Sequence, residues 1–311
     1  MLGYLFLAAS LAFGITKGYC GKKTSGAVRC ASEAMVVNTV RMIFCTIVGI
    51  IAILIGMLIG GAETVAISPR LLLISALAGI GSAAFTVSWL LSVRKGAYML
   101  VEVFVLLSII MPLVLCNIFF GEEISIIQWV GIALLIVAGY IMCAYNTSLN
   151  GKISFGAIIL LILIAVANGT VSFSHKLFTN TVEDGNVALF NLLTYVFAAL
   201  ALTICAFVFR KAEKKQEEKR GIFATIKPII IYVAIMAICL FLHSFFDTLA
   251  AQKLDAVQMF PLHNGGALIL SMLMSTIIFK EKISAKCIIG VCMAFGSLLI
   301  INFSDLIMKF L

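Results

Sequence analysis

The sequence predicts an all-α membrane protein with ten transmembrane helices, arranged as two five-helix repeats of inverted topology. Composition, the length of the apolar runs and an internal repeat predict this fold. Of the 311 residues, 63% are hydrophobic and only 12% are charged, and the mean hydropathy is +1.18. Soluble domains are about 45–50% apolar and about 25% charged. A chain of this composition therefore suits a surface that faces lipid.

The apolar runs have the length of membrane-spanning helices. Each is roughly 19–27 residues long, which is enough to cross about 30 Å of hydrocarbon. In the first run, Lys17, Lys22 and Lys23 follow the apolar stretch, whereas a cleaved signal peptide carries its basic residues before it. We therefore expect this run to be retained. The expected spans are 1–19, 34–60, 69–92, 97–120, 124–145, 153–174, 187–209, 228–250, 256–279 and 283–303.

An internal repeat divides these spans into two groups of five. The segment GEEISIIQWVG (121–131) resembles KEKISAKCIIG (280–290), and VVNTVRMIF (36–44) resembles LFNLLTYVF (189–197). Because five is an odd number, the second copy enters the membrane from the opposite side. Such inverted repeats are typical of transporters that alternate access around a site near the bilayer midplane. The predicted repeat units are residues 1–148 and 153–304.

The basic residues favour one orientation in the membrane. Most Lys and Arg residues lie in connections that follow odd-numbered spans, including the run RKAEKKQEEKR (210–220). Cytoplasmic connections carry an excess of such residues. The distribution predicts that both termini lie outside the cytoplasm of a bacterial-type plasma (inner) membrane. The same distribution explains the net charge of +8 without a nucleic-acid partner.

Cysteine and glycine patterns provide no sign of a metal, cofactor or catalytic site. The nine cysteines form no CxxC pair and no zinc spacing, and most lie inside apolar runs as small hydrophobes. No phosphate-binding glycine motif is present, so ATP hydrolysis is not expected. An enzyme would need a nucleophile with a base, or several ligands at one depth. We therefore expect a non-enzyme without cofactors.

The ends of the repeat units resemble a known family. Pro112 followed by FFGEEISIIQWVGIALLIVAG (119–139), and the second copy FKEKISAKCIIGVCMAFGSLLI (279–300), are similar to the drug/metabolite transporter superfamily, specifically its EamA-like branch. The run ending near Lys17 and Arg41 in the second span also resemble that pattern. The resemblance implies export or exchange of small metabolites through a central cavity. It also implies inside termini for many members, in contrast to the charge distribution.

Ionisable side chains inside the spans are the first candidates for the site, because such groups are costly in hydrocarbon unless they face a cavity or a partner. Glu102 could bind a cationic group, carry a coupling proton or pair with Arg41. Arg41 could be that ion-pair partner or could clamp an anionic substrate. Proton coupling is attractive because burial makes a carboxylate easier to protonate. His243 and Asp247 are one helical turn apart and share a face, where they could hold a proton, bind a basic substrate or simply satisfy each other.

Other polar residues, among them the ionisable His263, extend this set of candidates. In QMFPLHNGG (258–266), Pro261 and the paired glycines weaken the helix, and a broken helix can free backbone groups for a substrate. The corresponding stretch around Glu102 is expected to be continuous. Equivalent positions in the two halves hold asparagine. The hydrogen-bonding candidates are Gln258, His263, Asn264, Asn38, Asn191 and Tyr195, with Asn168 and Ser172 as further cavity residues.

Several polar or aromatic residues have simpler explanations. His175 and Lys176 lie near the end of a span and are expected to reach the interface. Trp89 and Trp129 are expected to be interfacial anchors.

The sequence thus predicts a secondary transporter that moves a small metabolite or drug by alternating access. An importer or facilitator of a sugar or another neutral metabolite, and a non-transporting membrane scaffold, are the alternatives. The expected partners are a small-molecule substrate and membrane lipid, with a homodimer as an option. The mixed charges of the candidates leave the sign of the substrate open.

Overall fold

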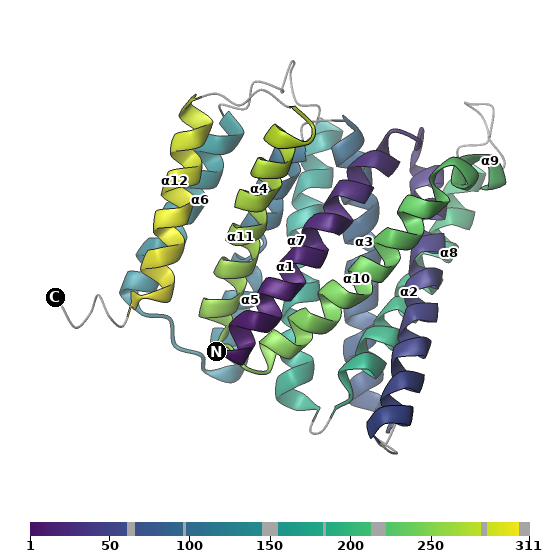
Figure 1. The fold of residues 1–311 in the computed structure, drawn as a ribbon, viewed down its shortest axis with the longest axis horizontal. Coiled ribbons are helices and arrows are strands. Elements are labelled where there is room, and N and C mark those ends of the chain that lie inside the picture. Colours follow the sequence, from purple (N-terminus) through teal and green to yellow (C-terminus); the bar gives the residue numbers. More distant parts are fainter. Residues whose placement is uncertain are drawn as a thin grey trace.

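The computed structural model describes residues 1–60, 66–95, 98–144, 155–182, 185–212, 222–280 and 285–304. All regular secondary structure within these ranges is helical, which confirms the predicted class (Figure 1). Each predicted span overlaps one helix or a pair of consecutive helices. The helices are α1 (Leu2–Ser25), α2 (Ala31–Gly60), α3 (Pro69–Lys95), α4 (Tyr98–Leu107), α5 (Ile110–Phe120), α6 (Ile126–Ala144), α7 (Phe155–Thr181), α8 (Val187–Ala212), α9 (Ile222–Ile226), the 3-10 turn η2 (Lys227–Ile229), α10 (Ile230–Ala251), α11 (Ala256–Ile277) and α12 (Ala285–Asn302).

Within the described ranges, six stretches are long and apolar enough to cross a membrane. Helices α6 and α12 are apolar but shorter, while α1 and α11 are diluted by polar residues such as Lys17, His263 and Asn264. The ten-span arrangement therefore stays a prediction. The six stretches are Ala31–Ile59, Pro69–Arg94, Val101–Phe120, Phe155–Thr181, Val187–Phe209 and Ala224–Ala251.

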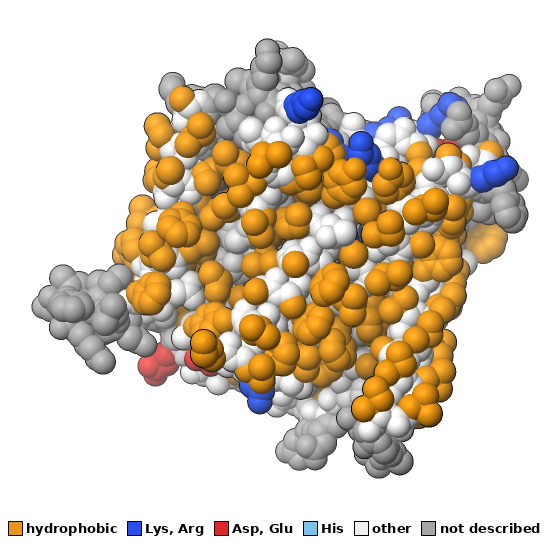
Figure 2. Space-filling model, viewed as in Figure 1, with side chains coloured by type: hydrophobic (Ala, Val, Ile, Leu, Met, Phe, Trp, Pro, Cys, Tyr) orange, Lys and Arg blue, Asp and Glu red, His pale blue; other side chains and the backbone are white. Residues whose placement is uncertain are grey.

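The outer surface is apolar over most of its height. Figure 2 shows hydrophobic side chains covering the middle of the visible face, with charged side chains near its upper and lower ends. Ile59 is 83% exposed and Leu73 is 73% exposed, and both lie on helices that a membrane would surround. Soluble proteins rarely expose an apolar patch larger than a few hundred Å². The surface therefore fits a protein whose solvent is lipid.

Helix packing joins the two predicted repeat units along their length. Helix α1 packs against α10, and α7 packs against α3. Helices α2 and α8, α4 and α11, and α6 and α12 also pack in pairs. Every one of these pairs joins residues 1–148 to residues 153–304. Exchanging the two halves converts the pair α1–α10 into α7–α3 and maps the other pairs onto themselves. Two equivalent halves would pack in this way, although their inverted relation itself stays a prediction.

The helix break lies in the fourth predicted span and not in the ninth. Helix α4 ends at Leu107 and α5 begins at Ile110, with Ser108 and Ile109 between them, so the stretch around Glu102 is continuous, as expected, and the break follows it. Pro112 supplies no N–H for the Ser108 carbonyl, and its ring crowds that carbonyl. Helix α11 continues through Pro261. The broken helix expected around this second proline is therefore not found.

Several features named in the sequence lie outside the described residues. These are most of the basic run at 210–220, from residue 213 onward, the connection between the two repeat units at 145–154, and Glu281 of the second repeat motif.

Candidate functional site

A cavity of about 130 Å³ lies in the centre of the helix bundle. Eight helices line it: α1, α2, α3, α4, α7, α8, α10 and α11. They correspond to predicted spans one to four and six to nine. Helices α6 and α12 pack against each other and contribute nothing to the lining. The cavity thus lies between the two halves, and each half supplies four of its helices.

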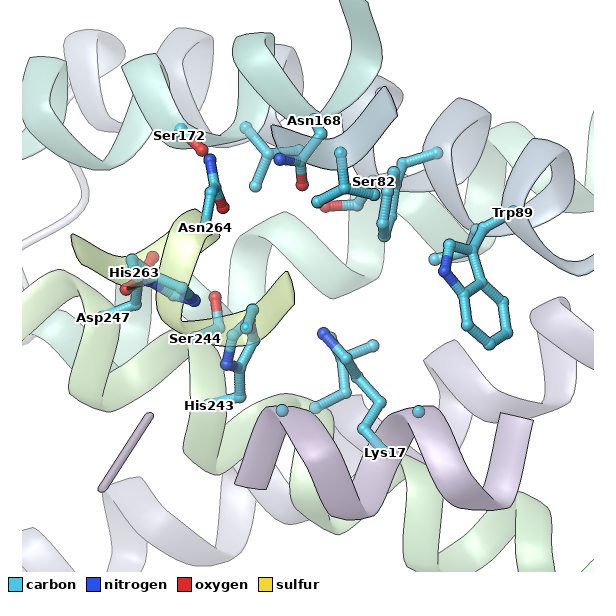
Figure 3. Close-up of a pocket in the computed structure, with 18 of the residues that line it drawn as sticks. Lys17, Ser82, Trp89, Asn168, Ser172, His243, Ser244, Asp247, His263 and Asn264 are labelled. Atoms are coloured by element: carbon cyan, nitrogen blue, oxygen red, sulfur yellow. Dashed lines mark ion pairs between the residues drawn. The ribbon is translucent and has the colours of Figure 1, made fainter. Parts of the chain in front are cut away.

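Lys17 is the central cation of the cavity, and its site role was missed in the sequence. The sequence placed it just before a loop, but α1 continues to Ser25 and keeps Lys17 inside the bundle. Figure 3 shows its side chain projecting from α1 into the cavity, with His243 on one side and Trp89 on the other. The next residue, Gly18, lets the Tyr98 side chain pack directly against α1, because a Cβ at this position would lie 2.5 Å from the Tyr98 hydroxyl.

Arg41 supplies a second cation from α2. Its side chain lines the cavity and the residue is only 4% exposed. In the part of the chain that the structure describes, its Nε and Nη2 atoms have no hydrogen-bond partner. A buried guanidinium normally satisfies its five donors. The unsatisfied donors mark Arg41 as a candidate ligand group.

Glu102 lines the cavity from α4, but it does not pair with Arg41. Its Oε1 atom accepts a hydrogen bond of 3.2 Å from Trp89 Nε1. The hydroxyls of Tyr98 and Ser271 lie 3.3 Å apart, and each also interacts with the Glu102 carboxylate. Trp89 is buried and holds this carboxylate, so the expectation of an interfacial anchor is wrong for it. Neutral donors therefore surround the acid.

Asp247 finds its partner on another helix. Its Oδ1 lies 2.6 Å from Nδ1 of His263 on α11. His243 does not complete a pair with Asp247 on α10, because its Nδ1 lies 2.9 Å from the Ser10 hydroxyl. The rings of His243 and His263 meet edge to face with centroids 5.2 Å apart. The sequence correctly placed His243 and Asp247 on one face, but the ion pair crosses between helices.

His175 belongs to the cavity and not to the membrane interface. It is buried, and its Nδ1 lies 2.6 Å from the Thr248 hydroxyl. Its Nε2 lies 3.3 Å from the Ser244 hydroxyl. Lys176 is also buried, and its Nζ forms an ion pair of 3.0 Å with Glu122. The expectation that both residues reach the interface is therefore wrong, because α7 extends to Thr181 and keeps them inside the bundle.

The remaining candidates divide into those that line the cavity and those that hold helices together. Asn38 donates to the Ala34 and Thr86 carbonyls, and Asn191 donates to the Val187 carbonyl. These two asparagines and Gln258 lie outside the lining. The predicted candidates in the lining are Arg41, Glu102, Tyr195, His243, Asp247, His263, Asn264, Asn168 and Ser172.

The lining brings together all three histidines of the chain, two cations and two carboxylates. Within the described ranges, no group of three or more His, Cys, Asp or Glu side chains has an arrangement suited to a metal ion. The arrangement can bind a polar molecule by charge and hydrogen bonds, and it can hold protons at several positions.

Comparison with known proteins gives a family match and a fold match. The model of the EamA-like transporter family matches residues 155–303. A solved crystal structure, titled only as a protein, shares 13% sequence identity with this chain at a TM-score of 0.71, covering 97% of this chain and 96% of the other. At this identity the likeness extends to the fold alone. No curated protein matches the chain.

Proposed function

Because residues 155–303 match the model of the EamA-like transporter family, we propose that the chain is a secondary transporter that exports or exchanges a small metabolite through the central cavity by alternating access. A family of transporters and a bundle of apolar helices support a membrane transporter of the drug/metabolite superfamily. The proposal goes beyond this class of protein in three respects: the direction of transport, its coupling to an ion gradient and the kind of substrate.

The observation that carries the proposal is the chemistry of the cavity in an otherwise apolar bundle. Ionisable groups at membrane depth cost several kcal/mol unless they line a pathway or find partners. Lys17, Arg41 and Glu102 from the first half meet His243 and Asp247 from the second half around one space. A scaffold has no need for such a set, whereas a transporter needs polar ligands at a place that both halves can enclose.

The carboxylates are suited to proton coupling. Glu102 accepts only from uncharged donors such as Trp89, so proton uptake there breaks no ion pair. Asp247 lies in an ion pair with His263, so proton binding by Asp247 would break that pair. A coupling group must change the relative stability of the two states of the transporter when it binds a proton. We assign that role to Glu102 and Asp247.

Alternating access would move the two halves relative to each other around the cavity. The break between α4 and α5 lies beside the cavity, where Asn168 donates a hydrogen bond of 2.7 Å to the Ser108 hydroxyl. Gly169 lets α7 approach this break, because a Cβ there would lie 3.1 Å from the Ser108 carbonyl oxygen. Such a junction can absorb a change in backbone angles without unfolding a span.

The proposal is tested with purified chain in proteoliposomes exposed to a polar metabolite extract. Metabolites that accumulate inside are identified by mass spectrometry, with and without an imposed pH gradient. The blocking variant is Ala267→Trp, which places a large ring in the lining, and the matched control is Ala133→Trp on the exposed face of α6. We expect the control to accumulate the same metabolites as the unmodified chain and the blocking variant to accumulate none.

Two further outcomes have defined meanings. Equal accumulation by Ala267→Trp and the unmodified chain, with both proteins inserted, would show that the cavity is not the pathway. Accumulation that ignores the pH gradient in the unmodified chain and in Glu102→Gln would favour a facilitator and remove the proton-coupling part of the proposal.

A further inference from the structure

The charges of the cavity are not balanced by direct contacts. Each carboxylate is engaged: Asp247 by His263 and Glu102 by Trp89. Neither carboxylate contacts a cation from Lys or Arg across the described cavity lining. Lys17 lies close enough to Arg41 to be repelled by it, and Glu102 and Asp247 attract Lys17 only through space, without an ion-pair contact. Two like charges kept together in a low-dielectric site require compensation.

The donors of these two cations point to what compensates them. Arg41 is 4% exposed, and its Nε and Nη2 atoms have no hydrogen-bond partner among the residues the structure describes. Lys17 has its ammonium in the cavity (Figure 3), and no described side chain forms an ion pair with it. Guanidinium and ammonium groups bind carboxylate and phosphate oxygens by charge-assisted hydrogen bonds.

We infer that the cavity binds a small organic anion whose carboxylate or phosphate group lies between Lys17 and Arg41. This inference rests on the proposed transport function and names its substrate class. A net cation is disfavoured, because each acid of the cavity already has a partner, His263 for Asp247 and Trp89 for Glu102. A zwitterion is disfavoured for the same reason, because both acids that its ammonium group could meet already have partners.

The opposite side of the cavity fits the uncharged part of such an anion. Asn264 and Ser172 lie together there, with Asn168 nearby, and offer amide and hydroxyl groups to a ligand (Figure 3). The volume of about 130 Å³ limits the ligand in this state. A cavity of about 150 Å³ holds benzene, so about six non-hydrogen atoms fit here. A short-chain organic acid or a small phosphate ester matches both the charge and the size.

The test separates the metabolite extract by ion exchange into an anionic fraction and a fraction of neutral, zwitterionic and cationic compounds. Each fraction is offered to proteoliposomes with the unmodified chain and with the blocking variant Ala267→Trp. We expect uptake that the blocking variant removes to come from the anionic fraction. Mass spectrometry of that uptake shows whether the acidic group is a carboxylate or a phosphate.

Variants of the two cations test their place in the site. Lys17→Met and Arg41→Gln should each lower the apparent affinity for the transported anion by about tenfold to a hundredfold, because each removes charge-assisted hydrogen bonds. Lys17→Arg should retain most of it. Lys23→Met is the matched control, because it removes an exposed lysine from the same helix. Lys17→Met leaves no known partner unsatisfied, so it is expected to fold even if Arg41→Gln does not.

The outcomes distinguish this inference from the function on which it rests. If uptake that the blocking variant removes comes from the neutral, zwitterionic and cationic fraction, transport stands and the anion site is wrong. An anionic substrate whose affinity is unchanged in Lys17→Met also overturns the assignment of the site. If neither fraction yields uptake that Ala267→Trp removes, the proposed function fails and the anion site fails with it.

Discussion

The buried ion pair between Lys176 and Glu122 is expected to contribute measurably to stability. Lys176 Nζ lies 3.0 Å from Glu122 Oε1, and the side chains are 5% and 17% exposed. The second carboxylate oxygen of Glu122 accepts the backbone N–H of Ala256 at the start of α11. One side chain therefore links the end of α5 to both α7 and α11. Loss of this link should loosen three helices at one end of the bundle.

The expected magnitude follows from the distance and the burial. At 3.0 Å and an effective dielectric constant of about 20, the attraction is roughly 5 kcal/mol, which desolvation largely offsets. A net coupling of about 1–3 kcal/mol remains. Glu122→Gln leaves a buried ammonium without an anionic partner and should destabilise the chain by about 2–4 kcal/mol. Lys176→Met should cost less, because Glu122 keeps the Ala256 N–H and some solvent.

The assay is a double-mutant cycle on the purified chain. The free energy of unfolding is measured in mixed micelles for the unmodified chain, for Glu122→Gln and Lys176→Met, and for the double variant. Lys253→Met is the matched control, because it removes an exposed lysine at the same end of the bundle, and it should change stability by no more than about 0.5 kcal/mol. Additive effects of the two single variants, to within about 0.5 kcal/mol, would refute a coupled buried pair.

Two other predictions concern packing and orientation. Gly79→Ala should destabilise the chain by about 1–3 kcal/mol, since its Cβ would lie 2.7 Å from the Thr194 carbonyl oxygen of α8. The control is Gly56→Ala, whose Cβ would meet nothing within 4 Å and which should leave stability unchanged or raise it slightly. Equal effects of the two variants on the free energy of unfolding would contradict the Gly79 contact. A fluorescent reporter that matures only in the cytoplasm should stay dark when fused to the C-terminus, because most basic residues follow odd-numbered spans; fluorescence in whole cells would reverse the predicted orientation.

The positions of the helices could be predicted because apolar length and repetition are local properties of the chain. The break after Leu107 was within reach of the sequence, since Pro112 is visible there and removes the hydrogen bond that would have closed that turn. Pro261 and its neighbouring glycines predicted a break in the ninth span, but α11 continues through them.

The contacts inside the cavity could not be predicted because they depend on helix depth and rotation. Lys17 follows an apolar run, and only the extension of α1 to Ser25 shows that it lies inside the bundle. Asp247 and His263 lie on different helices, so spacing along the chain gives no sign of their contact. An ionisable residue inside a span is a candidate site residue by default. This rule identified Asp247 and His263 separately, but it could not show that they contact each other.

The two halves share a fold but supply different chemistry to the cavity. Lys17, Arg41 and Glu102 come from the first half, whereas Asp247 and all three histidines of the chain come from the second. A symmetric ligand would gain little from such a division, because its two ends would meet unlike surroundings. A ligand with one acidic end and one uncharged polar end matches it. The asymmetry of the lining therefore supports a substrate that binds in one orientation, with its anionic group toward the first half.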